Sequence, residues 1–127
     1  MSNTPANAIL PHLINGHLCE ENKYAFSLST NGYLAFACYN KVMVLETVDT
    51  IRLCQNLNRH KYYVNRVLWC NENSFRLLSC DLKANIIIWN VIEGSVLTII
   101  TPQHKDDKQL LDVCWTKYSN GRHANVQ

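Results

Sequence analysis

The stretch RLLSCDLKANIIIWN, which runs from Arg76 to Asn90, contains two short apolar runs around the polar segment DLKAN. Neither run has room for a helix before or after it, and the polar residues between them are typical of a tight turn. We therefore predict two antiparallel strands that are joined by this turn and closed by the pair Trp89-Asn90.

The rest of the chain repeats this pattern of short strands and turns. Thr30-Asn31-Gly32 and Glu93-Gly94 are typical turn signals between apolar runs. The tail after Trp115, TKYSNGRHANVQ, is polar, and we expect it to lack a matching second strand. The predicted strands are Tyr24–Leu28, Tyr33–Cys38, Val42–Glu46, Ile51–Leu57, Val64–Cys70, Arg76–Cys80, Ile86–Asn90, Ser95–Ile100 and Leu110–Trp115.

Matching residues recur at a nearly constant interval along the chain. Leu45-Glu46 and Trp89-Asn90, which end two third strands, stand 44 residues apart, and Trp69 and Trp115 stand 46 apart. Three histidines follow each other at intervals of 43 and 44 residues, namely His17, His60 and His104. A period of this length indicates a repeat of four strands, as in a propeller blade.

The strand spacing also constrains the sheets. The connections inside each repeat are too short for parallel crossovers, so the sheets must be antiparallel. Ile86 and Ile88 point to one face of their strand while Ile87 and Trp89 point to the other, so both faces must be covered. No amphipathic helix is available, which favours stacked sheets. We predict an all-β fold of propeller blades, with a β-sandwich as the alternative.

Composition excludes several classes of protein. The 127 residues, 47% hydrophobic and 17% charged, are typical of one globular domain. The net charge of +2 and the scattered basic residues do not form the stripe of a nucleic-acid-binding protein. We find no signal-peptide pattern, and the run Ile86–Ile92 is far shorter than the ~20 residues of a membrane span. We expect a soluble cytoplasmic protein without direct membrane insertion.

Sites for metals, cofactors or catalysis have little support. No Ser-His-Asp order or nucleophile elbow accompanies His60, and Asp106-Asp107 reads as a solvated loop. The four glycines form no phosphate-binding pattern, so we expect no cofactor. An alternative is a small β-sandwich enzyme whose metal site joins His60, His104 and a cysteine. The six cysteines lack zinc-site spacing, and we expect buried thiols at Cys19, Cys38, Cys54, Cys70, Cys80 and Cys114.

The aromatic residues suggest a contact site. Tyr62-Tyr63 follows His60 on a connection between repeats, where a propeller exposes loops to partners. We regard these tyrosines as a possible partner contact, although one ring could instead pack beneath the loop. Trp69, Trp89 and Trp115 occupy repeated positions, which favours core packing over a ligand platform.

The second repeat contains, in order, Arg59-His60, Val64, Val67, Leu77-Leu78-Ser79 and Ile86–Asn90. This order resembles the WD-repeat family, in which Gly-His precedes the first strand and Trp-Asp ends the third. The resemblance implies a hydrogen-bonded network of a His, a Ser or Thr, a turn Asp and the Trp. His60, Ser79 and Trp89 match three of these positions. The Asp position falls on Lys83, so we expect an incomplete network, although Asp81 could substitute.

The resemblance implies two WD-type blades and the first strand of a third. We divide the chain into a partly ordered lead-in segment, a degenerate first blade, a second blade, and the start of a third blade with a polar tail, at residues 1–22, 23–58, 59–103 and 104–127. Repeat folds need about three or more units, so we expect a fragment of a longer scaffold.

The resemblance further implies a non-enzymatic protein-interaction scaffold. It is strongest to a branch of the family associated with vesicle tethering at the trans-Golgi network, ciliogenesis and Hedgehog signalling. The implied partners are subunits of a tethering or adaptor complex and the remaining blades of a full-length chain, with no nucleic acid. The implied location is cytoplasmic, peripheral at the trans-Golgi network or vesicles. A generic WD-repeat adaptor of another complex is the alternative.

Two substitutions test this interpretation. Trp89→Ala should lower the free energy of unfolding by about 3–5 kcal/mol, because it replaces a large buried side chain by a small one. Lys83→Asp should raise the free energy of unfolding if it restores a missing acceptor. Chemical denaturation of both variants measures the two effects, and an unchanged stability of Lys83→Asp would contradict the second expectation.

Overall fold

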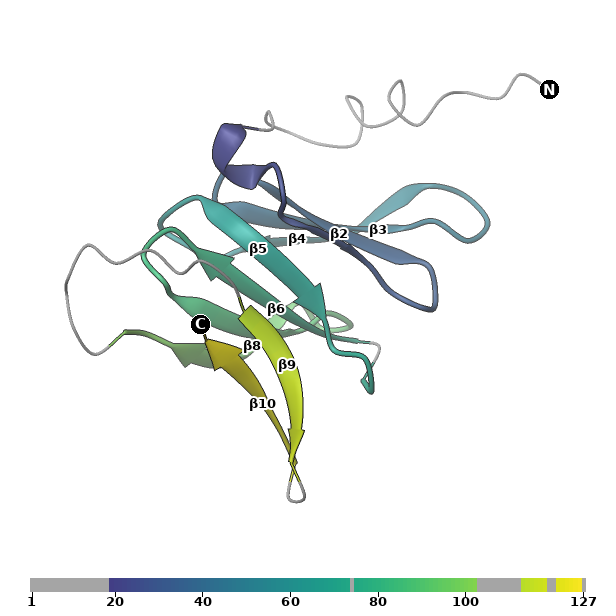
Figure 1. Ribbon diagram of the computed structural model, residues 1–127. Helices are drawn as coiled ribbons and strands as arrows, with labels where there is room; N and C mark the ends of the chain where they lie inside the picture. The colour runs from purple at the N-terminus through teal and green to yellow at the C-terminus, as the bar shows by residue number, and fades with distance from the viewer. Residues whose placement is uncertain (1–18, 74, 103–112, 119–120, 127) are drawn as a thin grey trace.

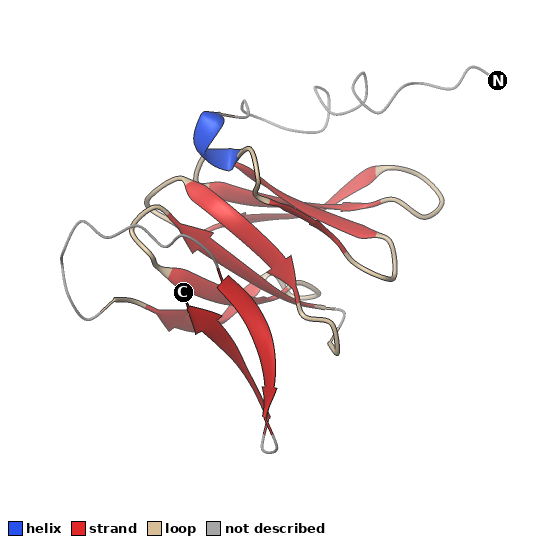
Figure 2. Cartoon of the chain, in the orientation of Figure 1, coloured by secondary structure: helices blue, strands red, loops and turns tan. Residues whose placement is uncertain are grey.

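The computed structural model describes residues 19–73, 75–102, 113–118 and 121–126, which form one short helix and ten strands (Figure 1 and Figure 2). In chain order the elements are η1 (Glu20–Asn22), β1 (Phe26–Leu28), β2 (Tyr33–Cys38), β3 (Lys41–Glu46), β4 (Arg52–Asn58), β5 (Val64–Trp69), β6 (Arg76–Asp81), β7 (Ile86–Asn90), β8 (Ser95–Ile100), β9 (Val113–Tyr118) and β10 (Gly121–Val126). None of the described residues belongs to a helix with the length and apolar character needed to cross a membrane.

The strands form three antiparallel sheets. The first sheet has the order β1-β2-β3-β4, the second sheet β5-β6-β7-β8, and β9 pairs with β10. In each four-stranded sheet every strand pairs with its neighbour in the chain, as the short connections require. The predicted all-β fold of antiparallel WD-type blades, in an incomplete propeller, is therefore confirmed.

The C-terminal tail differs from the prediction. β10 pairs with β9 over six residues, from Gly121↔Tyr118 to Val126↔Val113, so the expectation of a tail without a second strand is wrong. The pairing rests on backbone hydrogen bonds, which do not need the apolar side chains that mark a strand in a sequence. The predicted start of the first of these strands, at residues 110–112, lies outside the described residues.

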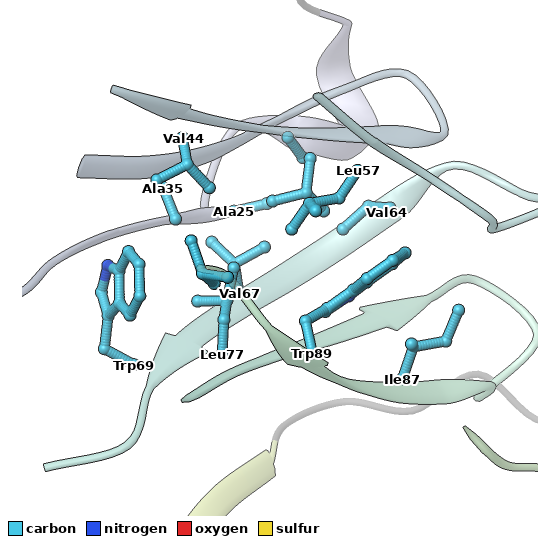
Figure 3. Close-up of a cluster of buried hydrophobic side chains, with 13 residues drawn as sticks. Ala25, Ala35, Val44, Leu57, Val64, Val67, Trp69, Leu77, Ile87 and Trp89 are labelled. Atoms are coloured by element: carbon cyan, nitrogen blue, oxygen red, sulfur yellow. The ribbon is translucent and has the colours of Figure 1, made fainter. Parts of the chain in front are cut away.

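The main core lies between the first and second sheets (Figure 3). The inner face of the first sheet contributes small and β-branched side chains such as Ala35 and Val44, and these are fully buried. The second sheet contributes larger side chains, including Trp69, Leu77 and Trp89, so large residues pack against small ones. One apolar face of each sheet is therefore satisfied by the other sheet.

The other face of the second sheet is also covered. Leu78, Cys80 and Ile86 form a buried cluster there, against which Trp115 of β9 packs. Figure 1 shows the β9–β10 hairpin below the second sheet and the first sheet above it. The second sheet is thus the middle of three layers, which explains why IIIW is apolar on both faces. This stacking rules out the two-layer β-sandwich alternative.

The two four-stranded sheets repeat each other in detail. The pairing register shifts between Val44 and Leu45 in the first sheet and between Ile88 and Trp89 in the second. These shifts lie 44 residues apart, at the interval that the sequence predicts. A β-bulge of this kind bends and twists its strand, so equal positions give both sheets the same local twist.

Successive layers are also joined by a repeated tryptophan hydrogen bond. Trp69 Nε1 of β5 donates to the carbonyl oxygen of Ser27 in β1 at 2.9 Å. Trp115 Nε1 of β9 donates to the carbonyl oxygen of Leu68 in β5 at 3.3 Å. Each bond runs from the first strand of one layer to the first strand of the layer before it. Trp69 is therefore buried in the core and Trp115 is partly buried against the second sheet, in line with the core packing that their spacing predicts. Their hydrogen bonds also fix the position of each layer on the one before it.

The cysteines whose side chains the structure describes are reduced thiols, namely Cys19, Cys38, Cys54, Cys70 and Cys80. Cys38, Cys70 and Cys80 are buried, as the sequence predicts, whereas Cys54 is exposed on the edge strand β4 and Cys19 is half-buried. Burial raises the pKa of the Cys80 thiol to about 12, so this thiol is inert. The prediction of buried thiols is wrong for Cys54, because alternate side chains of an edge strand face solvent.

Trp69→Phe tests the bond between the layers. Phenylalanine keeps most of the buried ring but leaves the Ser27 carbonyl without its donor, so the free energy of unfolding should fall by about 1–2 kcal/mol. Tyr62→Phe, at an exposed ring, is the control and should leave stability unchanged. Urea denaturation of both variants measures the difference, and equal stabilities would show that this bond does not hold the layers together.

Candidate functional site

The structure brings His60, Ser79 and Trp89 together inside the second sheet. Trp89 Nε1 donates to Ser79 Oγ at 2.8 Å, and Ser79 Oγ lies 2.6 Å from His60 Nε2. His60 comes from the loop before β5, Ser79 from β6 and Trp89 from β7. All three are buried, with Ser79 wholly inaccessible. The three residues therefore tie the loop between the sheets to the middle of the second sheet.

Asp81 completes this network, which corrects the expectation based on Lys83. Asp81 Oδ2 lies 2.9 Å from His60 Nδ1, and its side chain is buried. Lys83 is exposed, and its backbone N–H donates to Asp81 Oδ1 at 2.8 Å. Asp81 is the last residue of β6, and its side chain points along the turn as an Asx cap. A Lys83→Asp substitution therefore has no empty position to fill.

The Asp81 carboxylate also organises the β6–β7 turn. Its Oδ1 accepts hydrogen bonds from the backbone N–H of Asn85 at 3.1 Å and from Asn85 Nδ2 at 3.2 Å. Ala84 has a φ of 62° in this turn, a left-handed conformation that is costly for a residue with a side chain. The bonds to Asp81 offset this cost. The blade network and the tight turn thus share one carboxylate.

The electrostatics of Asp81 follow from these bonds. Burial acts to raise the pKa of the Asp81 carboxyl, but the hydrogen bonds from His60 and Asn85 outweigh it and hold this pKa below its ordinary value. The ionised carboxylate only accepts, so the His60 proton sits on Nδ1 and Nε2 accepts from the Ser79 hydroxyl. Every polar hydrogen along the network then has an acceptor.

The connectivity Asp81–His60–Ser79 is that of a hydrolase triad, although we expected no such order from the sequence. The chain order of His, Ser and Asp conceals it. The pairing of β6 with β5 brings Ser79 and Asp81 next to the loop before β5, where His60 contacts both. Its setting is unsuited to catalysis. Ser79 Oγ accepts from Trp89, and the side chains of Ser79 and His60 are buried beyond the reach of a substrate. The arrangement is a structural lock.

The metal-site alternative gains nothing from the structure. Within residues 19–73, 75–102, 113–118 and 121–126, no group of three or more His, Cys, Asp or Glu side chains could hold a metal ion. His17, His104 and Asp106-Asp107 lie outside the described residues. His60 has both ring nitrogens in the blade network, so neither is open to a metal.

Tyr62 and Tyr63 lie on the loop directly above the network. Their exposed fractions are 44% and 41%, so each ring is partly open to solvent. The Tyr63 ring contacts Tyr39 with centroids 5.4 Å apart, and Lys83 Nζ lies 5.9 Å from the centre of the Tyr62 ring. The loop is thus held from below by His60 while its aromatic rings remain exposed.

Asn22 is a key residue that the sequence does not reveal. Its Nδ2 donates to the carbonyl oxygens of Tyr39 at 3.0 Å and Val64 at 2.6 Å, and its Oδ1 accepts from the Tyr39 N–H at 2.7 Å. Tyr39 has a left-handed φ of 56°, so Asn22 holds a strained turn from both sides. The sequence around Asn22 gives no signal for this role, because the partners are backbone groups far along the chain.

Asp81→Asn should lower the free energy of unfolding by roughly 2–3 kcal/mol at neutral pH, because a charged acceptor of several buried bonds is lost. The folded-state pKa of Asp81 is depressed, so its stabilisation is complete above the unfolded value of about 4 and is lost as pH falls through the folded value. Denaturation from neutral to acidic pH should show the gap between the two proteins shrinking below about pH 4. Asp49→Asn, at an exposed turn, is the control, and a gap independent of pH would contradict the assignment.

Comparison with known proteins adds a family resemblance. No family model matches the chain. The curated proteins that match include WD repeat-containing protein 11 from Danio rerio, 28% identical over 130 residues that cover 88% of this chain. The proteins of the same name from Homo sapiens and Mus musculus are each 30% identical over 125 residues, or 84% of the chain. The chain spans about a tenth of the length of these relatives.

In the second sheet a histidine, a serine, an aspartate and a tryptophan form one buried network. The stacked four-stranded sheets, their 44-residue repeat and the matched sequences show that this chain has the fold and the sequence resemblance of the WD-repeat family.

Proposed function

We propose that this chain acts as a non-enzymatic scaffold whose loop at Tyr62-Tyr63 binds a partner protein. The observation that carries the proposal is the pair of exposed rings above a fully bonded buried network. Exposed aromatic side chains on a rigid support lose little conformational freedom on binding, and tyrosine is enriched among residues that dominate binding energies. The WD-repeat relatives support an interaction scaffold as the general role.

The geometry around the loop supports a preformed contact surface. Asn40 Nδ2 donates to the carbonyl of His60 at 3.0 Å, and the backbone N–H of Leu82 donates to the carbonyl of Tyr63 at 3.0 Å. The loop is therefore bonded to the β2–β3 turn of the first sheet and to the β6–β7 turn of the second sheet. A loop fixed in this way presents Tyr62 and Tyr63 in a defined arrangement, which lowers the entropic cost of binding.

We propose a second kind of partner, namely further blades of a longer chain. In this chain the two repeats are residues 23–58 and 59–103. In the second sheet, Trp69, Leu77 and Trp89 form one cross-strand row that packs on the first sheet. The corresponding row of the first sheet, on its outer face, is Leu28, Leu34 and Leu45. Leu28 is 67% exposed, and this apolar row supports stacking of another sheet on it.

The finer role that we propose is vesicle tethering at the trans-Golgi network, with links to ciliogenesis and Hedgehog signalling. Partners would then be subunits of a tethering or adaptor complex, and the location cytoplasmic and peripheral to Golgi or vesicle membranes. The support is the branch of the family that the sequence resembles. A generic adaptor in another complex would use the same loop, so the identity of the partner distinguishes the two.

An affinity pull-down with the chain and with a Tyr62→Ala/Tyr63→Ala variant tests the proposal. Quantitative mass spectrometry should show a set of proteins whose recovery falls roughly tenfold or more in the variant, as expected when binding hot spots are removed. Tyr24→Ala removes another exposed ring, 64% accessible and outside this loop, and should keep the whole set.

Equal recovery from the chain and from the double variant would contradict a contact at this loop. A dependent set without Golgi or vesicle-tethering proteins would contradict the finer role and favour the generic adaptor. Circular dichroism of the variants checks that the blades remain folded, which is expected because both rings are exposed.

A further inference from the structure

A pocket of about 370 Å³ lies between the first and second sheets, at the end of the strands opposite to Tyr62-Tyr63. Its lining from the first sheet includes Tyr33, Glu46 and Arg52, and its lining from the second includes Phe75. The pocket therefore exists only because the two sheets stack. Its volume is sufficient for one large side chain of a partner, although it is small for a drug-sized ligand.

The pocket has an aromatic wall with contributions from both sheets. The rings of Tyr33 and Phe75 meet edge to face, with centroids 5.9 Å apart and planes at 63°. On the other side, Gln55 Nε2 donates to the carbonyl of Ile92 at 3.3 Å and joins β4 to the turn after β7. These contacts between the sheets keep the two halves of the pocket at a fixed separation.

A carboxylate lies beside this wall, because Glu46 is the cross-strand neighbour of Tyr33. Both Arg52 Nε and Arg52 Nη2 lie 2.6 Å from Glu46 Oε2, so a single oxygen receives the guanidinium. Among the described residues, Glu46 Oε1 receives no hydrogen bond and keeps its accepting capacity. The Glu46 side chain is 25% exposed and the Arg52 side chain 69%, so the carboxylate lies deeper than its cation.

The surroundings of the pocket are acidic. The connections before β4, before β6 and after β7 lie at this end of the strands and contain Asp49, Glu72 and Glu93, while Arg52 and Arg76 begin β4 and β6 there. Arg52 is the one cation among the lining residues. A basic segment of a partner would therefore be attracted to this end of the molecule, where charge and shape are complementary to it.

We propose that this pocket binds an arginine side chain presented by a peptide segment of a partner protein. A guanidinium is planar, so it can stack on the Tyr33–Phe75 wall while its N–H groups donate to the Glu46 carboxylate. Its three-carbon stem would lie against Leu53 and Ile92, which also line the pocket. A carboxylate and an aromatic wall together select arginine over lysine, whose ammonium is compact and strongly hydrated.

Arg52 acts as an internal competitor in this arrangement. It holds the same carboxylate from the exposed rim, and an exposed ion pair contributes little stability, so an incoming guanidinium can displace it at small cost. Substitutions of the two residues should therefore act in opposite directions. Glu46→Gln removes the negative charge and replaces one accepting oxygen by a donor, so it should weaken binding. Arg52→Gln frees the carboxylate and should tighten binding.

The test is a titration of the 127-residue chain with N-acetyl-arginine-N-methylamide, followed by two-dimensional amide NMR. Saturable shifts should centre on Glu46, Gln55 and Phe75. Glu46→Gln should weaken the affinity roughly fivefold and Arg52→Gln should strengthen it by a similar factor, as expected for one partly exposed charge pair. Asp49→Asn is the matched control, since it removes a nearby carboxylate that does not line the pocket, and it should change affinity little.

Three outcomes would overturn the proposal: no saturable shifts, equal shifts with the norleucine analogue of the probe, or tighter binding of the glutamate analogue. The last outcome would reverse the signs of the two Gln variants, because Arg52 would then be the binding group. The amide spectrum of each variant reports whether it is folded. The Tyr62→Ala/Tyr63→Ala variant should bind the probe with unchanged affinity. The proposal for the pocket is therefore tested independently of the proposal for the loop.

Discussion

The hydrogen bond between Ser79 and His60 is the interaction on which the second sheet depends. Ser79 Oγ is the only atom in the network that touches both the tryptophan of β7 and the histidine of the preceding loop. Asp81 extends the same network by accepting hydrogen bonds from backbone N–H groups of the β6–β7 turn. Because these groups are buried, an unpaired member would carry its full desolvation cost. The loop, the middle strand and the turn are therefore formed together or not at all.

The layers depend on a different set of contacts. Large side chains of one sheet pack into a face of small side chains on the sheet before it, and a tryptophan N–H bonds to a strand carbonyl across the junction. Asn22 adds a third connection, since its amide bridges Tyr39 in the β2–β3 turn and Val64 in the second sheet. These contacts leave room near Glu46, where polar and apolar side chains together line the junction.

Most strands could be predicted from the sequence, because apolar runs and turn residues mark them and both faces of Ile86–Trp89 are apolar. Asp81 was harder to place, since the family pattern counts residues while the network depends on the direction of a side chain at the end of a strand. β10 has few apolar residues, and its backbone pairing leaves no trace in composition. The bonds of Asn22 join residues far apart in the chain, so no local pattern could reveal them.

Each sheet is built from one uninterrupted stretch of chain, with strands paired only to their sequence neighbours. Such a molecule can form in the order of its synthesis. The first sheet closes its own pairings before residue 59 is needed, and it then offers a surface on which β5 can condense. The topology therefore permits the fold to grow by the addition of layers in chain order, with each new layer packed on the one already made.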